Sequence, residues 1–279
     1  MKRLASKARV LAFALPVVLG GCGGHTDDAS PPTTYSIGGT ITGLGSNGLV
    51  LANGTDSTNP AMGALGFTFV QTVVGGSSYA VTVLTQPANA TCSVSQGAGT
   101  VGTAAVTTVQ VTCAANAYRV GGTISGLGSA GLVLANGADT VAPSMGASSF
   151  TFANAVAEGG SYAAGVQTQP SGTTCSVGNG SGTMGAADVT NVQVTCSPNA
   201  YGVGGTITGL TATGLVLANG ADTTSPAANA TSFALPAKVA FDGIYSVVVQ
   251  QQPTGLSCTV GGAFPATMGA ADVTNVSVT

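Results

Sequence analysis

The chain repeats one stretch of sequence three times at a fixed spacing. Tyr35, Tyr118 and Tyr201 each open a copy, and each copy begins 83 residues after the one before it. Every copy continues through Gly-Gly-Thr-Ile to a second block, Gly-Leu-Val-Leu-Ala-Asn-Gly. Such a repeat indicates one folding unit in tandem, and a unit of this size can form its own core. The units predicted from the repeat are residues 35–117, 118–200 and 201–279.

The residue pattern within each copy predicts β-strands. Short runs of Val, Ile, Thr and Phe are separated by turn residues such as Asn-Gly. In the second copy, Tyr162, Ala164 and Val166 fall on one face, as expected for a strand with one buried side. The pair Gly121-Gly122 predicts a bulge or a close approach of two backbones. About six or seven strands per copy predict an all-β fold of three tandem, small antiparallel β-sandwiches.

The amino terminus has the parts of an export signal. A basic segment precedes the apolar run of residues 10–19, which is too short to cross a bilayer about 30 Å thick. Small residues and Cys22 follow this run, so residues 1–21 are predicted to be a signal peptide. The basic residues are Lys2, Arg3, Lys7 and Arg9.

Leu19-Gly20-Gly21-Cys22 resembles the lipobox of bacterial lipoproteins. The resemblance implies that Cys22 opens the mature chain and carries acyl chains such as palmitate, and several such chains anchor a protein stably. Gly23, rather than Asp, follows Cys22, which by analogy favours the bacterial outer membrane, at its cell-surface or periplasmic face. Residues 22–34 are then expected to form the acylated end and a flexible tether. The alternative is an ordinary secretory signal with an incidental cysteine.

Two cysteines in each of the first two copies are in phase with buried valines. Cys92 and Cys113 are 21 residues apart, as are Cys175 and Cys196. Because export leads to an oxidising compartment, we predict two disulfides, Cys92–Cys113 and Cys175–Cys196, each contributing about 3 kcal/mol. The alternative is a pair of buried free thiols. Zinc is less favoured, because each unit has two ligands of this kind and no histidine nearby.

The third copy differs at its end. It carries one extra residue in the loop 261–265, and its last strand reaches Thr279 where a cysteine would come next. Cys258 is therefore left as an unpaired thiol in this sequence. Two interpretations stay open: the sequence is a fragment, or the unit carries a free thiol, which is inert if buried and able to link two molecules if exposed.

The repeat as a whole, residues 35–279, resembles the immunoglobulin-like and Cna-B (prealbumin-like) modules of bacterial surface proteins. The resemblance lies in the opening Gly-Gly-Thr-Ile, a Phe-x-Phe strand, and the glycine that precedes Tyr79, Tyr162 and Tyr245. It implies a spacer or a binding module rather than an enzyme. The cysteine positions and the absence of Trp argue against the antibody type of topology.

The distribution of charge excludes some partners. From Cys22 onward the chain has two basic side chains, Arg119 and Lys238, against nine acidic ones, a formal charge of −7. Nucleic-acid binding requires a basic surface, and so does electrostatic adhesion to anionic lipid. We therefore expect no nucleic-acid partner, and contact with a membrane through the lipid anchor alone.

The repeats lack the usual catalytic groups. The single histidine, His25, lies in the tether, so a nucleophile paired with histidine is not expected, and no cofactor is predicted. Aspartates recur beside turns, where capping of the turn is the favoured interpretation. The alternative is a Ca²⁺ site built from the Asn and Asp of each Asn-Gly turn, although Ca²⁺ takes six to eight oxygen ligands. These pairs are Asn53 with Asp56, Asn136 with Asp139, and Asn219 with Asp222, and the other recurring acids are Asp188 and Asp272.

The sequence thus favours a non-enzymatic, membrane-anchored surface lipoprotein whose repeats form a structural or display array. A second hypothesis is an adhesin-like module that binds a glycan or a protein through inter-strand loops such as residues 56–65 and 222–231. An enzyme is the third hypothesis and the least favoured.

Overall fold

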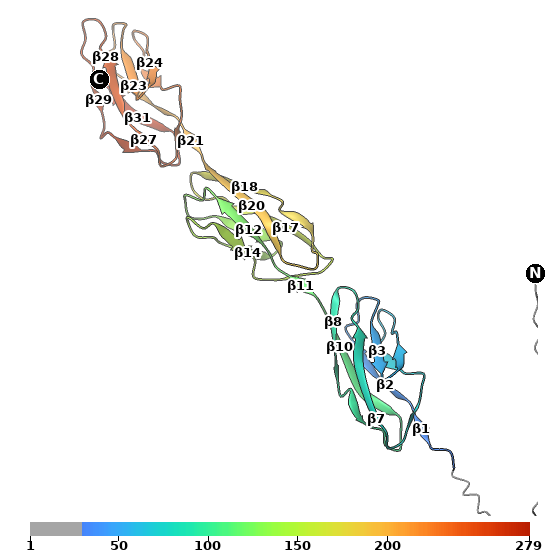
Figure 1. Ribbon diagram of the computed structural model, residues 1–279. Helices are drawn as coiled ribbons and strands as arrows, with labels where there is room; N and C mark the ends of the chain where they lie inside the picture. The colour runs from blue at the N-terminus through green and yellow to red at the C-terminus, as the bar shows by residue number, and fades with distance from the viewer. Residues whose placement is uncertain (1–29) are drawn as a thin grey trace, which may run out of the picture.

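The computed structural model describes residues 30–279, which form strands, turns and loops without a helix (Figure 1). The strands gather in three units that follow one another end to end, in chain order. The predicted signal peptide, Cys22 and the first part of the predicted tether lie outside the described residues.

The strands of unit 1 are β1 (Thr34–Tyr35), β2 (Ile37–Thr42), β3 (Val50–Asn53), β4 (Asp56–Thr58), β5 (Gly66–Thr68), β6 (Val73–Val74), β7 (Ser78–Thr85), β8 (Ala90–Ser95), β9 (Ala98–Thr100) and β10 (Val106–Ala115). The strands of unit 2 are β11 (Ala117–Tyr118), β12 (Val120–Ser125), β13 (Val133–Asn136), β14 (Asp139–Val141), β15 (Ser149–Thr151), β16 (Val156–Ala157), β17 (Ser161–Thr168), β18 (Thr173–Gly178), β19 (Ser181–Thr183) and β20 (Val189–Pro198). The strands of unit 3 are β21 (Ala200–Tyr201), β22 (Val203–Ile207), β23 (Val216–Asn219), β24 (Asp222–Thr224), β25 (Ser232–Ala234), β26 (Val239–Ala240), β27 (Ile244–Tyr245), β28 (Val247–Gln251), β29 (Val260–Gly261), β30 (Ala266–Thr267) and β31 (Val273–Val278).

Each unit is a small β-sandwich, as the sequence predicts. In unit 2, the sheet β15-β12-β20-β18 faces the sheet β14-β13-β17-β19, and the short pair β11-β16 lies beside them. One strand pair per unit is parallel. In this pair the first long strand lies beside the last and runs in the same direction, as β12 does beside β20. The remaining pairs are antiparallel. The strands outnumber the six or seven expected, since pieces of two or three residues are too short to show an alternating pattern.

The buried side chains form one cluster per unit. Two phenylalanines on the edge strand meet edge to face, with ring centroids 5.7 Å apart for Phe67 and Phe69 and 5.6 Å apart for Phe150 and Phe152. In unit 3, Leu235 takes the place of the second ring. The opening tyrosines pack against these clusters. These recurrent aromatic residues therefore belong to the core of each unit or pack against it.

The double glycine of each unit lies at a bulge where two strands approach closely. In unit 2, the register of β12 against β20 shifts between Val120 and Gly122. A Cβ atom on Gly122 would overlap the carbonyl oxygen of Val192, so only glycine fits this position. Units 1 and 3 have the same crowding at Gly39 and Gly205. The sequence predicts a bulge or a close approach of two backbones, and the close approach is confirmed.

A glutamine covers the exposed edge of the first sheet in each unit. In unit 2, the Gln169 side chain accepts from the backbone N–H of Cys175 at 2.7 Å and donates to its carbonyl oxygen at 2.9 Å. The same two bonds join Gln86 to Cys92 and Gln252 to Cys258. One side-chain amide thus makes the two hydrogen bonds that a neighbouring strand would make. It occupies the backbone N–H and C=O groups of an edge strand that could otherwise pair with another chain.

Candidate binding groove and recurring polar contacts

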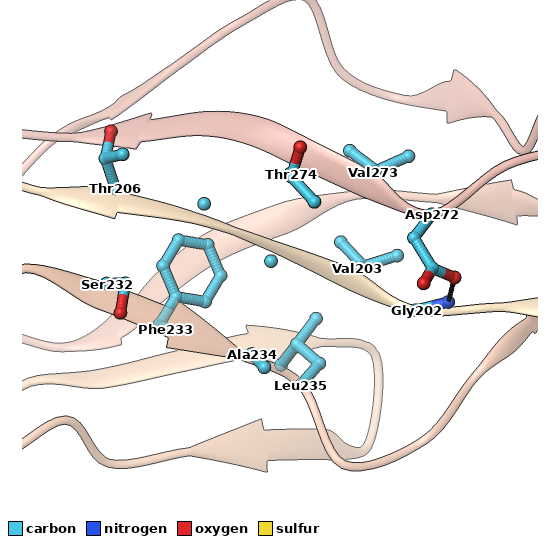
Figure 2. A pocket seen from close by; sticks show the side chains of 12 residues that line it. Gly202, Val203, Thr206, Ser232, Phe233, Ala234, Leu235, Asp272, Val273 and Thr274 are labelled. Atoms are coloured by element: carbon cyan, nitrogen blue, oxygen red, sulfur yellow. Dashed lines mark hydrogen bonds between the residues drawn. The ribbon is translucent and has the colours of Figure 1, made fainter.

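A groove lies over the double glycine of unit 3 (Figure 2). Its volume is about 370 Å³, and it is lined by parts of β22, β25 and the start of β31. Figure 2 shows Phe233 and Leu235 to one side of β22, and Val273 and Thr274 of β31 to the other. Because Gly204 and Gly205 lack side chains, backbone forms much of the floor of the groove.

Hydroxyl groups are the main polar chemistry of this groove. Thr206, Ser232 and Thr274 are exposed along it and can donate and accept hydrogen bonds. Asp272 lies at one end, but its Oδ1 atom already accepts from the N–H of Gly202 at 2.7 Å (Figure 2). The polar side chains of the groove are thus three hydroxyl groups and one carboxylate, and one oxygen of this carboxylate is bonded to a backbone N–H.

Unit 2 has a groove at the same place, with a volume of about 250 Å³. Asp188 again holds a backbone group, because its Oδ1 atom accepts from the N–H of Arg119 at 2.7 Å. Arg119 also lines this groove and adds a positive charge that unit 3 lacks at this point. The groove therefore occurs in at least two of the three units.

The aspartates that follow the Asn-Gly turns hold a distant loop. In unit 1, Asp56 Oδ2 accepts from the N–H of Gln71 at 2.8 Å, and Asn53 Oδ1 accepts from the N–H of Ala80 at 2.9 Å. Both bonds recur in units 2 and 3. The sequence favours capping of the adjacent turn by these aspartates. The side chains instead bind backbone groups that are 15 and 27 residues away in the chain.

The same contacts use oxygen atoms that the alternative interpretation assigns to a Ca²⁺ site. Asn53 Oδ1 and one carboxylate oxygen of Asp56, Oδ2, each accept from a different backbone N–H group. Within residues 30–279, no three His, Cys, Asp or Glu side chains come together in a way that could hold a metal ion. The observed role of each Asn and Asp is thus to fix the loops of the sandwich.

The cysteines lie on neighbouring strands of the first sheet. Cys92 and Cys113 are cross-strand partners, with Sγ atoms joined at 2.03 Å, and Cys175 and Cys196 are joined in the same way at 2.09 Å. Cys258 is buried and free. The chemical state of these thiols in the native protein stays a prediction that a thiol count can test.

The loops considered as an adhesin surface are not among the residues that line the two grooves. Residues 222–231 do not line the groove of unit 3. Each loop is instead held against the exit of the first long strand, where Gly63 donates to the Leu44 carbonyl at 2.9 Å and Asn229 to the Leu210 carbonyl at 2.6 Å. The unit 1 loop exposes apolar side chains, with Met62 59% and Leu65 81% exposed.

The part of the chain from residue 30 onward holds no helix of the length and apolarity that a membrane crossing requires. Any attachment to a membrane through Cys22 concerns residues that the structure does not describe.

Searches against family models and against curated proteins gave no match. Among solved structures, the TIE protein of Bacillus anthracis is 13% identical, with a TM-score of 0.48, over 87% of this chain and 50% of that one. Two B repeat units of the collagen binding protein of Staphylococcus aureus are 12% identical, with a TM-score of 0.32, over 88% of this chain and 74% of theirs. The major pilin subunit of Bacillus cereus is 9% identical, with a TM-score of 0.30, over 88% of this chain and 99% of that one. The chain thus spans half the length of the first of these proteins, and at these scores the likeness carries no argument about activity or ligand.

Proposed function

We propose that this chain is a non-enzymatic lipoprotein of the bacterial outer membrane, whose three β-sandwich units form a structural or display array. The observation that carries the proposal is that the polar side chains recurring from unit to unit are used to build the scaffold. Asn, Asp and Gln at equivalent positions bind backbone groups in all three units. A repeated unit whose polar groups hold its own loops is suited to length and stability rather than to chemistry.

The placement of the carboxylates supports the non-enzymatic part of this proposal. A general acid or base must reach a substrate, and a catalytic pair must flank a cleft. Asp188 and Asp272 are the carboxylates at the grooves, and each accepts from a backbone N–H at 2.7 Å. The two lie in different units, so neither groove contains a pair of acids.

The lipid anchor is supported by the sequence Leu19-Gly20-Gly21-Cys22, since a thiol is the nucleophile that accepts the diacylglyceryl group. Replacing Cys22 by serine removes this thiol and leaves the export signal in place. We expect Cys22→Ser to move the protein from the membrane fraction to the soluble fraction of its host, as measured by fractionation and blotting. Cys258→Ser is the matched control and should stay in the membrane fraction. Retention of Cys22→Ser with the membranes would show that the anchor proposal is wrong.

The grooves favour a second candidate function, binding of a neutral glycan or a protein at the cell surface. A groove of the same position occurs in units 2 and 3, and hydroxyl groups line it. The test is a glycan and protein array probed with the wild-type chain and with Thr206→Arg/Thr274→Arg, which fills the unit 3 groove from two exposed positions. A ligand lost in this variant supports groove binding. Binding that survives the double substitution assigns the ligand to another surface, and an array without ligands favours the display function.

A further inference from the structure

A single residue separates the last strand of unit 1 from the first strand of unit 2, and the same holds for units 2 and 3. Asn116 lies between the end of β10 at Ala115 and the start of β11 at Ala117. Asn199 lies in the same way between β20 and β21. Units of one chain move relative to one another unless something restrains them, so the contacts of these two residues decide how stiff the array is.

Asn116 is bonded to both of the units that it connects. On the side of unit 1, its N–H donates to the Asn89 carbonyl at 3.0 Å, and its Oδ1 atom accepts from the Thr91 hydroxyl at 2.8 Å. On the side of unit 2, its carbonyl accepts from the N–H of Glu158 at 2.8 Å, and its Nδ2 atom donates to Glu158 Oε2 at 3.2 Å. The main chain and the side chain of one asparagine therefore join the two units.

Asn199 repeats three of these four bonds at the second junction. Its N–H donates to the Gly172 carbonyl at 2.8 Å, its Oδ1 atom accepts from the Thr174 hydroxyl at 2.7 Å, and its carbonyl accepts from the N–H of Phe241 at 2.7 Å. The position before unit 1 is Thr33, whose carbonyl accepts from the N–H of Gly75 at 3.0 Å. The backbone bond to the following unit therefore occurs at all three positions. At Asn116 and Asn199, the side chain adds a bond to the preceding unit.

The two junctions differ in the residues that lie beside the asparagine. At the first junction, Glu158 Oε2 accepts from the Asn116 side chain, and Asn89 and Glu158 line the same small pocket. At the second, Phe241 replaces the glutamate, and its ring lies where a side chain at residue 172 would be. Gly172 corresponds to Asn89, and both have a positive φ, of 64° and 58°. A Cβ atom at residue 172 would overlap the ring, so any other residue there would displace the Phe241 side chain.

We infer that Asn116 and Asn199 hold successive units in one orientation. The bond from Asn116 to Glu158 completes the first junction, and the close approach of Gly172 to the Phe241 ring completes the second. This inference deepens the array function proposed above and rests on it for its biological meaning. The contacts themselves belong to the folded units and do not involve the lipid anchor.

The test compares the orientation of units 2 and 3 in solution. Residual dipolar couplings are measured on the full exported chain carrying Cys22→Ser, and an alignment tensor is fitted to each unit. We expect one common tensor for units 2 and 3 in this parent chain. Asn199→Ala and Gly172→Asn should each give different tensors for the two units, because one loses the side-chain bond and the other displaces the Phe241 ring. The melting temperatures of the units should stay unchanged for Asn199→Ala.

Two further variants provide the controls. Gly255 is the equivalent of Gly172 in unit 3, with φ +72° and no atom within 4 Å of a Cβ, so Gly255→Asn should keep the common tensor. The double variant Gly172→Asn/Phe241→Glu recreates the first type of junction and should restore it. Separate tensors in the parent chain, or a common tensor in Asn199→Ala, would overturn the inference. Either result would leave the anchoring test with Cys22→Ser unaffected.

Discussion

Replacing Gly122 by alanine is expected to unfold unit 2 well below the melting temperature of the wild-type chain. The new Cβ atom would overlap the carbonyl oxygen of Val192 on the parallel strand β20, and the three nearest atoms all belong to the Val192 backbone, so no flexible side chain can move aside. We expect a loss of at least about 3 kcal/mol in the free energy of unfolding, at the upper end for overpacked sites. Differential scanning calorimetry measures this loss, and hydrogen exchange of the β12 and β20 amides assigns it to unit 2.

Gly185→Ala is the matched control for this substitution. Gly185 lies in the same unit, is exposed, and has no atom within 4 Å of the point that a Cβ atom would occupy. Alanine there should leave the melting temperature unchanged or raise it slightly, since glycine loses more backbone freedom on folding. Equal effects of the two substitutions would contradict the close approach of β12 and β20.

The second large effect is expected on removal of the unit 2 disulfide. Cys175 and Cys196 lie opposite each other on β18 and β20, 21 residues apart in sequence, and their bond restricts the unfolded chain. The double variant Cys175→Ala/Cys196→Ala should lose about 3 kcal/mol. For a unit of this size the melting temperature should then fall by roughly 12 to 24 °C. Calorimetry under non-reducing conditions gives the measurement.

Cys258→Ala controls for the loss of packing in this experiment. Cys258 occupies the position of Cys175 in unit 3, is buried and is free, so its replacement removes a sulfur atom without removing a cross-link. We expect a smaller decrease for Cys258→Ala than for the double variant in unit 2. If the two decreases are equal, the disulfide does not contribute the predicted stability.

The repeat and the strand pattern could be predicted because both are local in sequence. Tyr162, Ala164 and Val166 alternate with outward side chains, and this period indicates a strand with one buried face. The double glycine was informative for the same reason, since glycine inside a strand indicates a bulge or a close approach. The parallel pairing of β12 with β20 could not be predicted from a local pattern, because the two strands lie at opposite ends of the unit in sequence.

The contacts that the sequence did not reveal are made by polar side chains with distant partners. Asp56 looks like a turn residue, yet it binds the N–H of Gln71 in another loop. Gln169 looks like the end of a strand, yet its amide covers Cys175 at the sheet edge. The role of Asn116 and Asn199 was not predicted, although their recurrence at the boundary between repeats was a usable signal. Neither the period of the apolar residues nor the composition indicates which backbone group a polar side chain will bind.

The intact mass of the protein from its native host, with and without reduction, decides whether the chain is a lipid-anchored array of disulfide-linked units. We expect a chain that begins at Cys22, carries three acyl chains, and gains the mass of four hydrogen atoms on reduction of its two disulfides. A mass without lipid would contradict the anchor and make this an unanchored exported protein. A mass unchanged by reduction would contradict the cross-links within the units.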